Sequence, residues 1–176
     1  AFARYQEEQA WTWEHQALTR ARFCVGDTQI GQAFESIRNN ILQTPRDNAH
    51  LRQEVATMRQ KMRDNTPKTP DGLFDIKKDA GGLIDLEFAV QTLILSHAAQ
   101  HPTLCHNAGN IALLGYAAQA GLIPDDLAIR TQNAYRHLRH TLHLQQLAGN
   151  TAGLIPIAQV QTHQEAIQAL WKMLFV

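Results

Sequence analysis

Apolar side chains recur every three to four residues along most of this chain, and this spacing constrains the fold more than any other feature. In each segment that shows it, the spacing places a row of apolar side chains on one face of a helix. Two segments show it most clearly: residues 28–42 with Ile30, Phe34, Ile37 and Ile41, and residues 45–64 with Leu51, Val55, Met58 and Met62. Because such a face needs a second apolar surface to cover it, we expect packed helices.

The other helices are predicted from the same periodicity and from residues that start or stop helices. They are expected over residues 1–23 with a break near Ala10, over 83–99, 107–120 and 124–148, and from Thr162 to the end. Asp27 is expected to cap the helix at 28–42, and Thr44, Pro45 and Asp47 to start the next one.

No run of residues alternates in the manner of a strand. We therefore predict an all-α fold, a bundle of about seven helices in one domain over residues 1–176. Residues 83–99 are apolar on most sides, which predicts a central buried helix. One long irregular loop remains at about 65–82, and loops of that length inside compact domains are often functional.

The charge balance excludes some classes of function. Sixteen Lys and Arg balance sixteen Asp and Glu, so an overall electrostatic grip on nucleic acid or an anionic membrane is not expected. No apolar stretch reaches the length of a membrane span. Cys24 and Cys105 form no disulfide framework and no zinc site by themselves, which is typical of a reducing, cytoplasmic setting. The chain lacks a signal-peptide pattern and an initiator Met, so we expect a piece of a longer protein.

The end of the loop carries the densest cluster of unusual residues. Lys77 and Lys78 precede Gly81 and Gly82 at a predicted helix start. Glycines let a ligand approach the backbone closely, and helix N-termini favour anions, so this loop can face a phosphate. In the alternative, Asp79 caps the helix, the glycines make the turn, and the lysines are solvated.

Two further groups of charged residues lie on the predicted helices. Asp85 and Glu87 diverge by about 200° on a helix, so one metal ion could not easily take both, and either acid needs a partner or water. The alternative for them is a structural salt bridge or hydrogen bond. Arg52, Arg59 and Arg63 fall within about 40° of one another, a row that suits phosphate or carboxylate recognition, or else a solvated face.

Two tryptophans and three histidines complete the candidates. Trp11 and Trp13 cannot both face one core stripe, so one is expected to pack against another domain, or both lie at a wet boundary of the bundle. His137, His140 and His143 step by three along one helix and splay apart, so no metal site is predicted. No motif for Ser-His-Asp or Cys-His catalysis is present.

Three segments together resemble glutamine synthetase adenylyltransferase (glutamate–ammonia-ligase adenylyltransferase). In chain order they are Trp-Thr-Trp-Glu-His-Gln-Ala-Leu-Thr-Arg-Ala-Arg at 11–22, Met-Arg-Gln-Lys-Met-Arg at 58–63, and Phe-Asp-Ile-Lys-Lys-Asp-Ala-Gly-Gly-Leu-Ile-Asp-Leu-Glu-Phe at 74–88. The resemblance covers nearly the whole chain and weakens after about residue 148. It is to the helical domain that follows the C-terminal nucleotidyltransferase domain of that family.

The resemblance implies an activity for the parent protein. The parent is expected to transfer AMP from ATP onto a tyrosine of glutamine synthetase with Mg²⁺, and a second half to remove the AMP by phosphorolysis. Glutamine and a small trimeric nitrogen-signalling protein would set the direction. Family catalysis uses a Gly-Ser followed by an Asp-x-Asp, and this sequence contains neither. We therefore expect an upstream catalytic domain, an inactive fragment with no cofactor bound to it, and no catalytic residue here.

The resemblance also assigns expected roles. Residues 74–88 would form one wall of the catalytic cleft, with Lys77 or Lys78 near nucleotide phosphates or the substrate loop. Asp85 or Glu87 would hold the domain interface or orient the loop. Trp13, Glu14 and Arg20 would lie at the domain junction.

Two alternatives remain open. In one, the chain is a non-catalytic module that docks the signalling protein or glutamine synthetase through Arg52, Arg59, Arg63 and the loop 65–80. In the other, it is the related helical domain of the uridylyltransferase that modifies the signalling protein, which the Trp-rich segment fits less well.

Overall fold

The structure, a computed structural model, describes all residues 1–176 and confirms the helical class. Eight α-helices form most of it: α1 (Phe2–Glu8), α2 (Thr12–Leu18), α3 (Thr28–Leu42), α4 (Asn48–Asp64), α5 (Leu83–His97), α6 (Asn110–Gln119), α7 (Asp125–Leu147) and α8 (Gln161–Phe175). Two short 3₁₀ turns, η1 (Pro102–Cys105) and η2 (Ile157–Gln159), join them. None of the helices combines the length and the apolar character that crossing a membrane requires.

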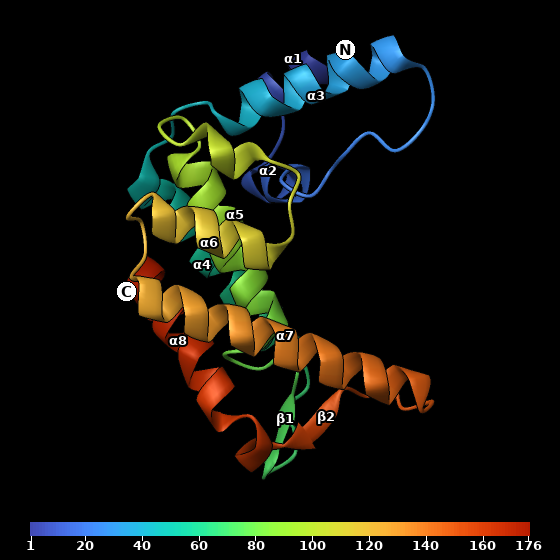
Figure 1. Ribbon diagram of the computed structural model, residues 1–176, viewed down its shortest axis with the longest axis vertical. Coiled ribbons are helices and arrows are strands. Elements are labelled where there is room, and N and C mark those ends of the chain that lie inside the picture. Colours follow the sequence, from blue (N-terminus) through green and yellow to red (C-terminus); the bar gives the residue numbers. More distant parts are fainter.

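A small sheet interrupts the helical fold, and the prediction of no strand was wrong here. Strand β1 (Leu73–Asp75) pairs antiparallel with β2 (Leu154–Pro156), with Phe74 opposite Ile155. Each strand has three residues, too few for an alternating pattern to show in the sequence. The sheet lies at the opposite end of the molecule from α1 and α3 (Figure 1).

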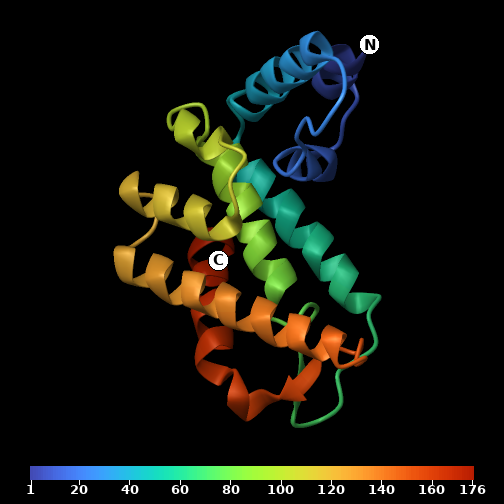
Figure 2. The ribbon, with the colours of Figure 1, turned by 45° about the vertical axis from the view of Figure 1, so that its right-hand side comes forward.

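Helix α5 is the central element, as predicted. Ten of its fifteen residues are buried, and it contacts α2, α4, α6, α7 and α8. In Figure 2, α4 lies alongside α5, and α6 and α7 cross on the other side of it. The core at α5 includes its own Leu86 and Ile94 and, from α6, α7 and α8, Leu114, Leu138 and Leu170, all almost fully buried. Because α5 is covered on nearly every side, any polar group along it must find a partner inside the protein.

The helix starts were predicted with mixed success. Asp27 caps α3 by accepting from the backbone N–H groups of Gln29 and Ile30. Helix α4 begins at Asn48, with Asp47 rather than Thr44 as its cap. Thr162 does not cap α8, which begins one residue earlier without a side-chain cap. The first helical segment breaks near Ala10 as predicted, but α2 ends at Leu18, five residues before the predicted end at residue 23.

Arg38 fastens the N-terminal helices to the rest of the bundle. Its buried guanidinium donates three hydrogen bonds to backbone carbonyls: Nε to Leu18 at 3.1 Å, Nη2 to Thr19 at 2.9 Å and Nη1 to Cys105 at 2.9 Å. These carbonyls lie at the ends of α2 and η1, where helical hydrogen bonds become fewer. The carbonyl of Leu18 also accepts from the N–H of Ala21 at 3.2 Å, whereas Arg38 is the donor on which those of Thr19 and Cys105 depend. One side chain on α3 therefore satisfies the polar groups of two neighbouring elements.

Arg38→Leu is expected to lower the free energy of unfolding by about 2–4 kcal/mol, because it leaves the buried carbonyls of Thr19 and Cys105 without donors and that of Leu18 with only the N–H of Ala21. Urea unfolding followed by circular dichroism measures the change. Arg136→Leu, at an exposed arginine of α7, is the matched control and should change the stability by less than about 0.5 kcal/mol. Equal effects of the two substitutions would contradict this role for Arg38.

Candidate functional site

The segment between β1 and α5 is a compact turn held by its own hydrogen bonds. The Asp75 carboxylate accepts from the backbone N–H groups of Lys77 and Lys78, each at 2.9 Å. The N–H of Leu83 donates to the carbonyl of Ile76 at 2.9 Å, which closes the turn. We call residues 75–82 the lysine loop. Its backbone is fixed at both ends, so the positions from which its two lysines extend are fixed as well.

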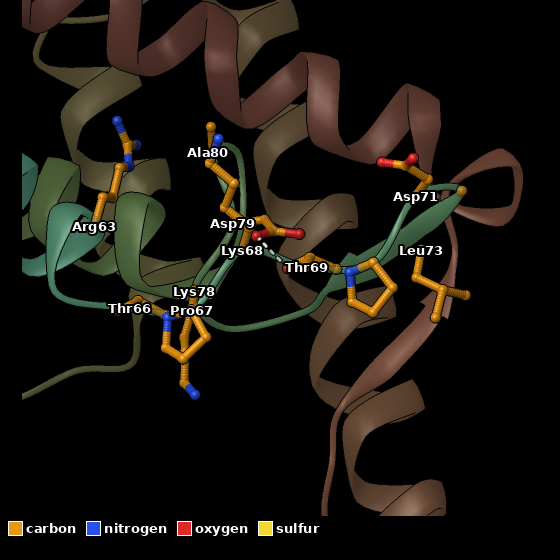
Figure 3. Close-up of a pocket in the computed structure, with 12 residues that line it drawn as sticks. Arg63, Thr66, Pro67, Lys68, Thr69, Asp71, Leu73, Lys78, Asp79 and Ala80 are labelled. Atoms are coloured by element: carbon orange, nitrogen blue, oxygen red, sulfur yellow. Dashed lines mark hydrogen bonds between the residues drawn. The ribbon is translucent and has the colours of Figure 1, made fainter.

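Asp79 does not cap α5, contrary to the alternative considered from the sequence. The N-cap of α5 is Gly82, which has no side chain to act as a cap. The Asp79 carboxylate instead accepts from the Thr69 hydroxyl at 2.7 Å and from the N–H of Asp75 at 2.8 Å. Figure 3 shows the Thr69–Asp79 bond, which ties the outer arm of the 65–82 segment to the lysine loop.

The two glycines are needed for close packing. Gly81 has φ of +85°, and a side chain there would lie 2.7 Å from the backbone oxygen of Gln164 on α8. A side chain at Gly82 would lie 2.8 Å from the carbonyl oxygen of Ile76. Both glycines are buried, and the amides of Gln164 and Gln168 donate to the carbonyl of Ala80. This geometry supports the turn interpretation, while a contact between these glycines and phosphate stays a prediction.

Asp85 is the centre of a buried charge cluster. Arg59 Nε donates to its Oδ1 at 2.7 Å, and Arg63 Nη2 donates to its Oδ2 at 2.5 Å. The N–H of Gly81 also donates to Oδ2, at 2.8 Å. Arg59 donates in addition to the carbonyl of Lys78 at 2.6 Å. The cluster therefore joins α4, the lysine loop and α5, as expected if Asp85 orients the loop.

The predicted arginine row is divided by this cluster. Arg59 is fully buried, and Arg63 is about a quarter exposed and lies over the Trp171 ring, 5.5 Å from its centre. Both bind the carboxylate of Asp85 rather than facing solvent. Arg52 stands apart, with its Nε buried and lacking a hydrogen-bond partner. The anion that two of the three arginines recognise is thus a carboxylate of the same chain.

Glu87 has a different environment from Asp85, although only one residue separates them. It is half-buried and makes no hydrogen bond or ion pair with another side chain. Burial raises the pKa of its carboxyl group above the ordinary value. Three nearby cations act in the opposite direction, in order of effect Arg20, Arg139 and Lys77. Asp85 and Glu87 do not share one site, and no group of three His, Cys, Asp or Glu side chains is placed to hold a metal ion.

Lys77 and Lys78 are both exposed, but they line different pockets. Lys78 borders a pocket of about 440 Å³ under the 65–82 segment (Figure 3). Arg63, Lys68, Asp71 and Asp79 also line it, so its charges are mixed. Lys77 borders a second pocket, of about 430 Å³, whose other wall is the C-terminal half of α7.

The α7 wall contains Arg139, which the sequence analysis missed, beside two histidines that it had considered only as metal ligands. Arg139 lines the pocket of Lys77 together with His140 and His143. His137 lies elsewhere and stacks on His163 with ring centres 4.4 Å apart. The sequence did contain a signal for this surface. Arg139 and His143 are four residues apart, and no carboxylate lies one helical turn from either, a pattern that concentrates positive charge on one helix face.

The predicted domain-junction residues lie at the surface of α2 and just beyond its end. Trp13 is 54% exposed, and Arg20 is exposed and donates to the side-chain oxygen of Asn110 at 2.9 Å. Glu14 has a local role, because it accepts from the Tyr5 hydroxyl at 2.6 Å and from the N–H of Trp11 at 2.9 Å. Both tryptophans border a pocket against α4 instead of filling the core. Their contact with another domain stays a prediction.

Family models match two parts of the chain. The model described as glutamate-ammonia ligase adenylyltransferase matches residues 1–37, and the model described as GlnD PII-uridylyltransferase matches residues 49–173. Among the most similar relatives are bifunctional glutamine synthetase adenylyltransferase/adenylyl-removing enzymes. The one from Aromatoleum aromaticum is 49% identical over 99% of this chain, that from Chromobacterium violaceum 49% over 99%, and that from Nitrosomonas europaea 52% over 85%.

The chain belongs to the glutamine synthetase adenylyltransferase family. Its residues 49–173 also match the family described as GlnD PII-uridylyltransferase. The chain spans 18%, 19% and 16% of the lengths of the three relatives, in the order Aromatoleum, Chromobacterium, Nitrosomonas. The uridylyltransferase alternative rests on the match at 49–173, whereas these relatives, which match 85% or more of the chain, are adenylyltransferases.

In this adenylyltransferase-family chain, Asp85→Asn is expected to lower the free energy of unfolding by about 3 kcal/mol. The substitution leaves the buried Arg59 without a counter-charge, which is costly in the protein interior. Urea unfolding measures the effect. Asp71→Asn, at an exposed acid that accepts no hydrogen bond, is the control and should change the stability by less than about 0.5 kcal/mol. If both substitutions left the stability unchanged, the cluster would not hold the fold together.

Glu87→Gln should instead raise the free energy of unfolding at neutral pH, by less than about 1 kcal/mol, because it removes a carboxylate that burial disfavours. The penalty on the carboxylate is complete above the raised pKa of the folded state and absent below the unfolded pKa, ordinarily 4.5. The gain should therefore disappear as the pH falls below that value. Urea unfolding across this range, with the exposed Glu7→Gln as control, tests it; a gain that is independent of pH would contradict the cause given.

Proposed function

We propose that the chain is the helical accessory domain of an enzyme that transfers AMP from ATP to a tyrosine of glutamine synthetase, and so regulates nitrogen assimilation in the cytoplasm. The observation that carries this proposal is the identity of 49% with the Aromatoleum aromaticum enzyme over 99% of the chain. That relative is named for both adenylylation and removal of the adenylyl group. The parent of this chain would therefore be a nucleotidyltransferase with both activities.

The residues of the chain argue for an accessory role within that enzyme. Both oxygens of Asp85 are engaged by arginines and a backbone N–H, and Glu87 faces a separate set of cations. The two acids therefore do not form the paired carboxylates that hold Mg²⁺ against a triphosphate. We assign Mg²⁺ and ATP to a nucleotidyltransferase domain of the same parent chain, where the metal would stabilise the charge of the transferring group.

The lysine loop is the part of this domain that we place against the catalytic domain. The Asp85 cluster and the turn at Asp75 fix its backbone, so its lysines extend from a rigid support. Trp13 and Arg20 extend the same interface from α2 and its end, since both are exposed and tryptophan and arginine contribute strongly to interfaces. In this role the chain closes one wall of the cleft and excludes water from it.

AMP transfer from α-labelled ATP to glutamine synthetase tests the proposal. The 176-residue chain is assayed alone, and again inside the full-length Aromatoleum aromaticum enzyme, where it replaces the matching segment. We expect no labelling by the chain alone and labelling by the hybrid. Labelling by the chain alone would show that an active site lies within residues 1–176. An inactive hybrid that folds normally would contradict the accessory role.

A non-catalytic docking module is the second candidate. Its predicted surface included Arg52, Arg59 and Arg63, and Asp85 engages two of these three arginines inside the protein. The surface that favours docking is the pocket of Trp11 and Trp13 against α4. A pull-down with glutamine synthetase or the nitrogen-signalling protein separates the candidates: capture by the isolated chain, lost on Trp13→Ala, would favour the module.

A further inference from the structure

A pocket of about 430 Å³ lies between the lysine loop and the C-terminal half of α7, and its lining is unusually basic. Six residues form it: Lys77, Arg139, His140, Leu142, His143 and Gln146. Two of them carry a permanent positive charge, two more are histidines, and none is acidic. We call it the α7 pocket. The pocket of Lys78 differs in kind, because Asp71 and Asp79 lie among its cations (Figure 3).

The two permanent cations of the α7 pocket have no partner in the chain. The side chains of Lys77 and Arg139 make no hydrogen bond and no ion pair with any residue, whereas Arg59 and Arg63 each bind Asp85. The imidazoles of His140 and His143 are also without a hydrogen-bond partner. Like charges held close together repel one another, and an anion placed between them removes that cost. Several donors in this pocket are therefore free to bind a ligand.

The fold fixes the backbone positions from which these cations extend. Lys77 extends from the turn that Asp75 holds, and Arg139 and His143 are one helical turn apart on α7. Glu87 of α5 does not line the pocket, but it is near enough for Arg20, Arg139 and Lys77 all to favour its ionised form. Cations from three elements thus act on one half-buried carboxylate without forming an ion pair with it. Its single charge leaves an excess of positive charge at the surface.

We infer that the α7 pocket binds a phosphate group. The Arg139 guanidinium can present two parallel N–H donors to a phosphate, and the Lys77 ammonium and histidine N–H groups add further donors. A phosphate group carries about 1.5 to 2 negative charges at pH 7 and a polyphosphate carries more, which offsets the excess cations better than the single charge of a carboxylate. Binding is by this chain itself and does not rest on AMP transfer, so either proposal can fail without the other.

Calorimetric titration of the 176-residue chain with sodium triphosphate and with inorganic phosphate, at low salt, tests the inference. We expect saturable binding at one site that weakens as salt rises. Arg139→Gln and Lys77→Gln should each weaken it by about fivefold or more, because each removes a charged donor. Two matched controls remove the same charge nearby: Arg136→Gln on α7 and Lys78→Gln on the lysine loop. They should weaken binding less than about twofold.

The pattern across the four variants decides the result, with circular dichroism and urea unfolding establishing that each variant is folded. Equal weakening by all four would show only general attraction between charges and would overturn the inference. Absence of saturable binding by the unsubstituted chain would overturn it as well. ATP and adenosine identify the source of the phosphate. ATP binding more tightly than triphosphate supports a nucleotide ligand, and equal affinities support the phosphate chain alone; adenosine binding as tightly as ATP would overturn the assignment.

Discussion

The carboxylate of Asp85 is the group on which the arrangement of this domain depends. It lies on a helix that is covered on nearly every side, where an unpaired charge would be prohibitively unfavourable. Arg59, Arg63 and the N–H of Gly81 satisfy both of its oxygens. Removing two charges from water offsets much of their attraction, so such a pair contributes more to a unique geometry than to stability. We interpret the cluster as the fixed point that sets the lysine loop against α4 and α5.

The fixed backbone of the lysine loop also determines where Lys77 and Lys78 lie. In the sequence, Lys77 and Lys78 are two adjacent bases. In the structure, they follow the turn at Asp75 and line two different pockets. Lys78 joins a pocket in which acids balance the bases, and Lys77 joins one that contains only bases among its charged residues. Two adjacent lysines therefore lie in different charge environments. A substitution of one is a matched control for the same substitution of the other.

Local patterns predicted the helices, because a period of 3.6 residues and caps such as Asp27 are properties of neighbouring residues. The pairing of β1 with β2 depends on segments far apart in the chain, so nothing near Phe74 indicates it. The arginine row was placed correctly on one helix face, yet whether Arg59 is solvated depends on Asp85, which comes from another helix. The sequence did contain a hint: an acid within an apolar helix needs a partner, and a row of arginines beside an apolar stripe can supply one.

The balanced charge of the whole chain also concealed its local electrostatics. Sixteen bases and sixteen acids exclude an overall field that attracts anions, but they do not determine where each charge lies. Asp85 pairs with two of the bases, Arg59 and Arg63, whereas Lys77 and Arg139 at the surface pair with no acid. Without a long-range field, an anion is attracted only within about a Debye length of the α7 pocket, roughly 10 Å at moderate salt. Selectivity there depends on donor geometry, since the net charge of the chain contributes nothing to it.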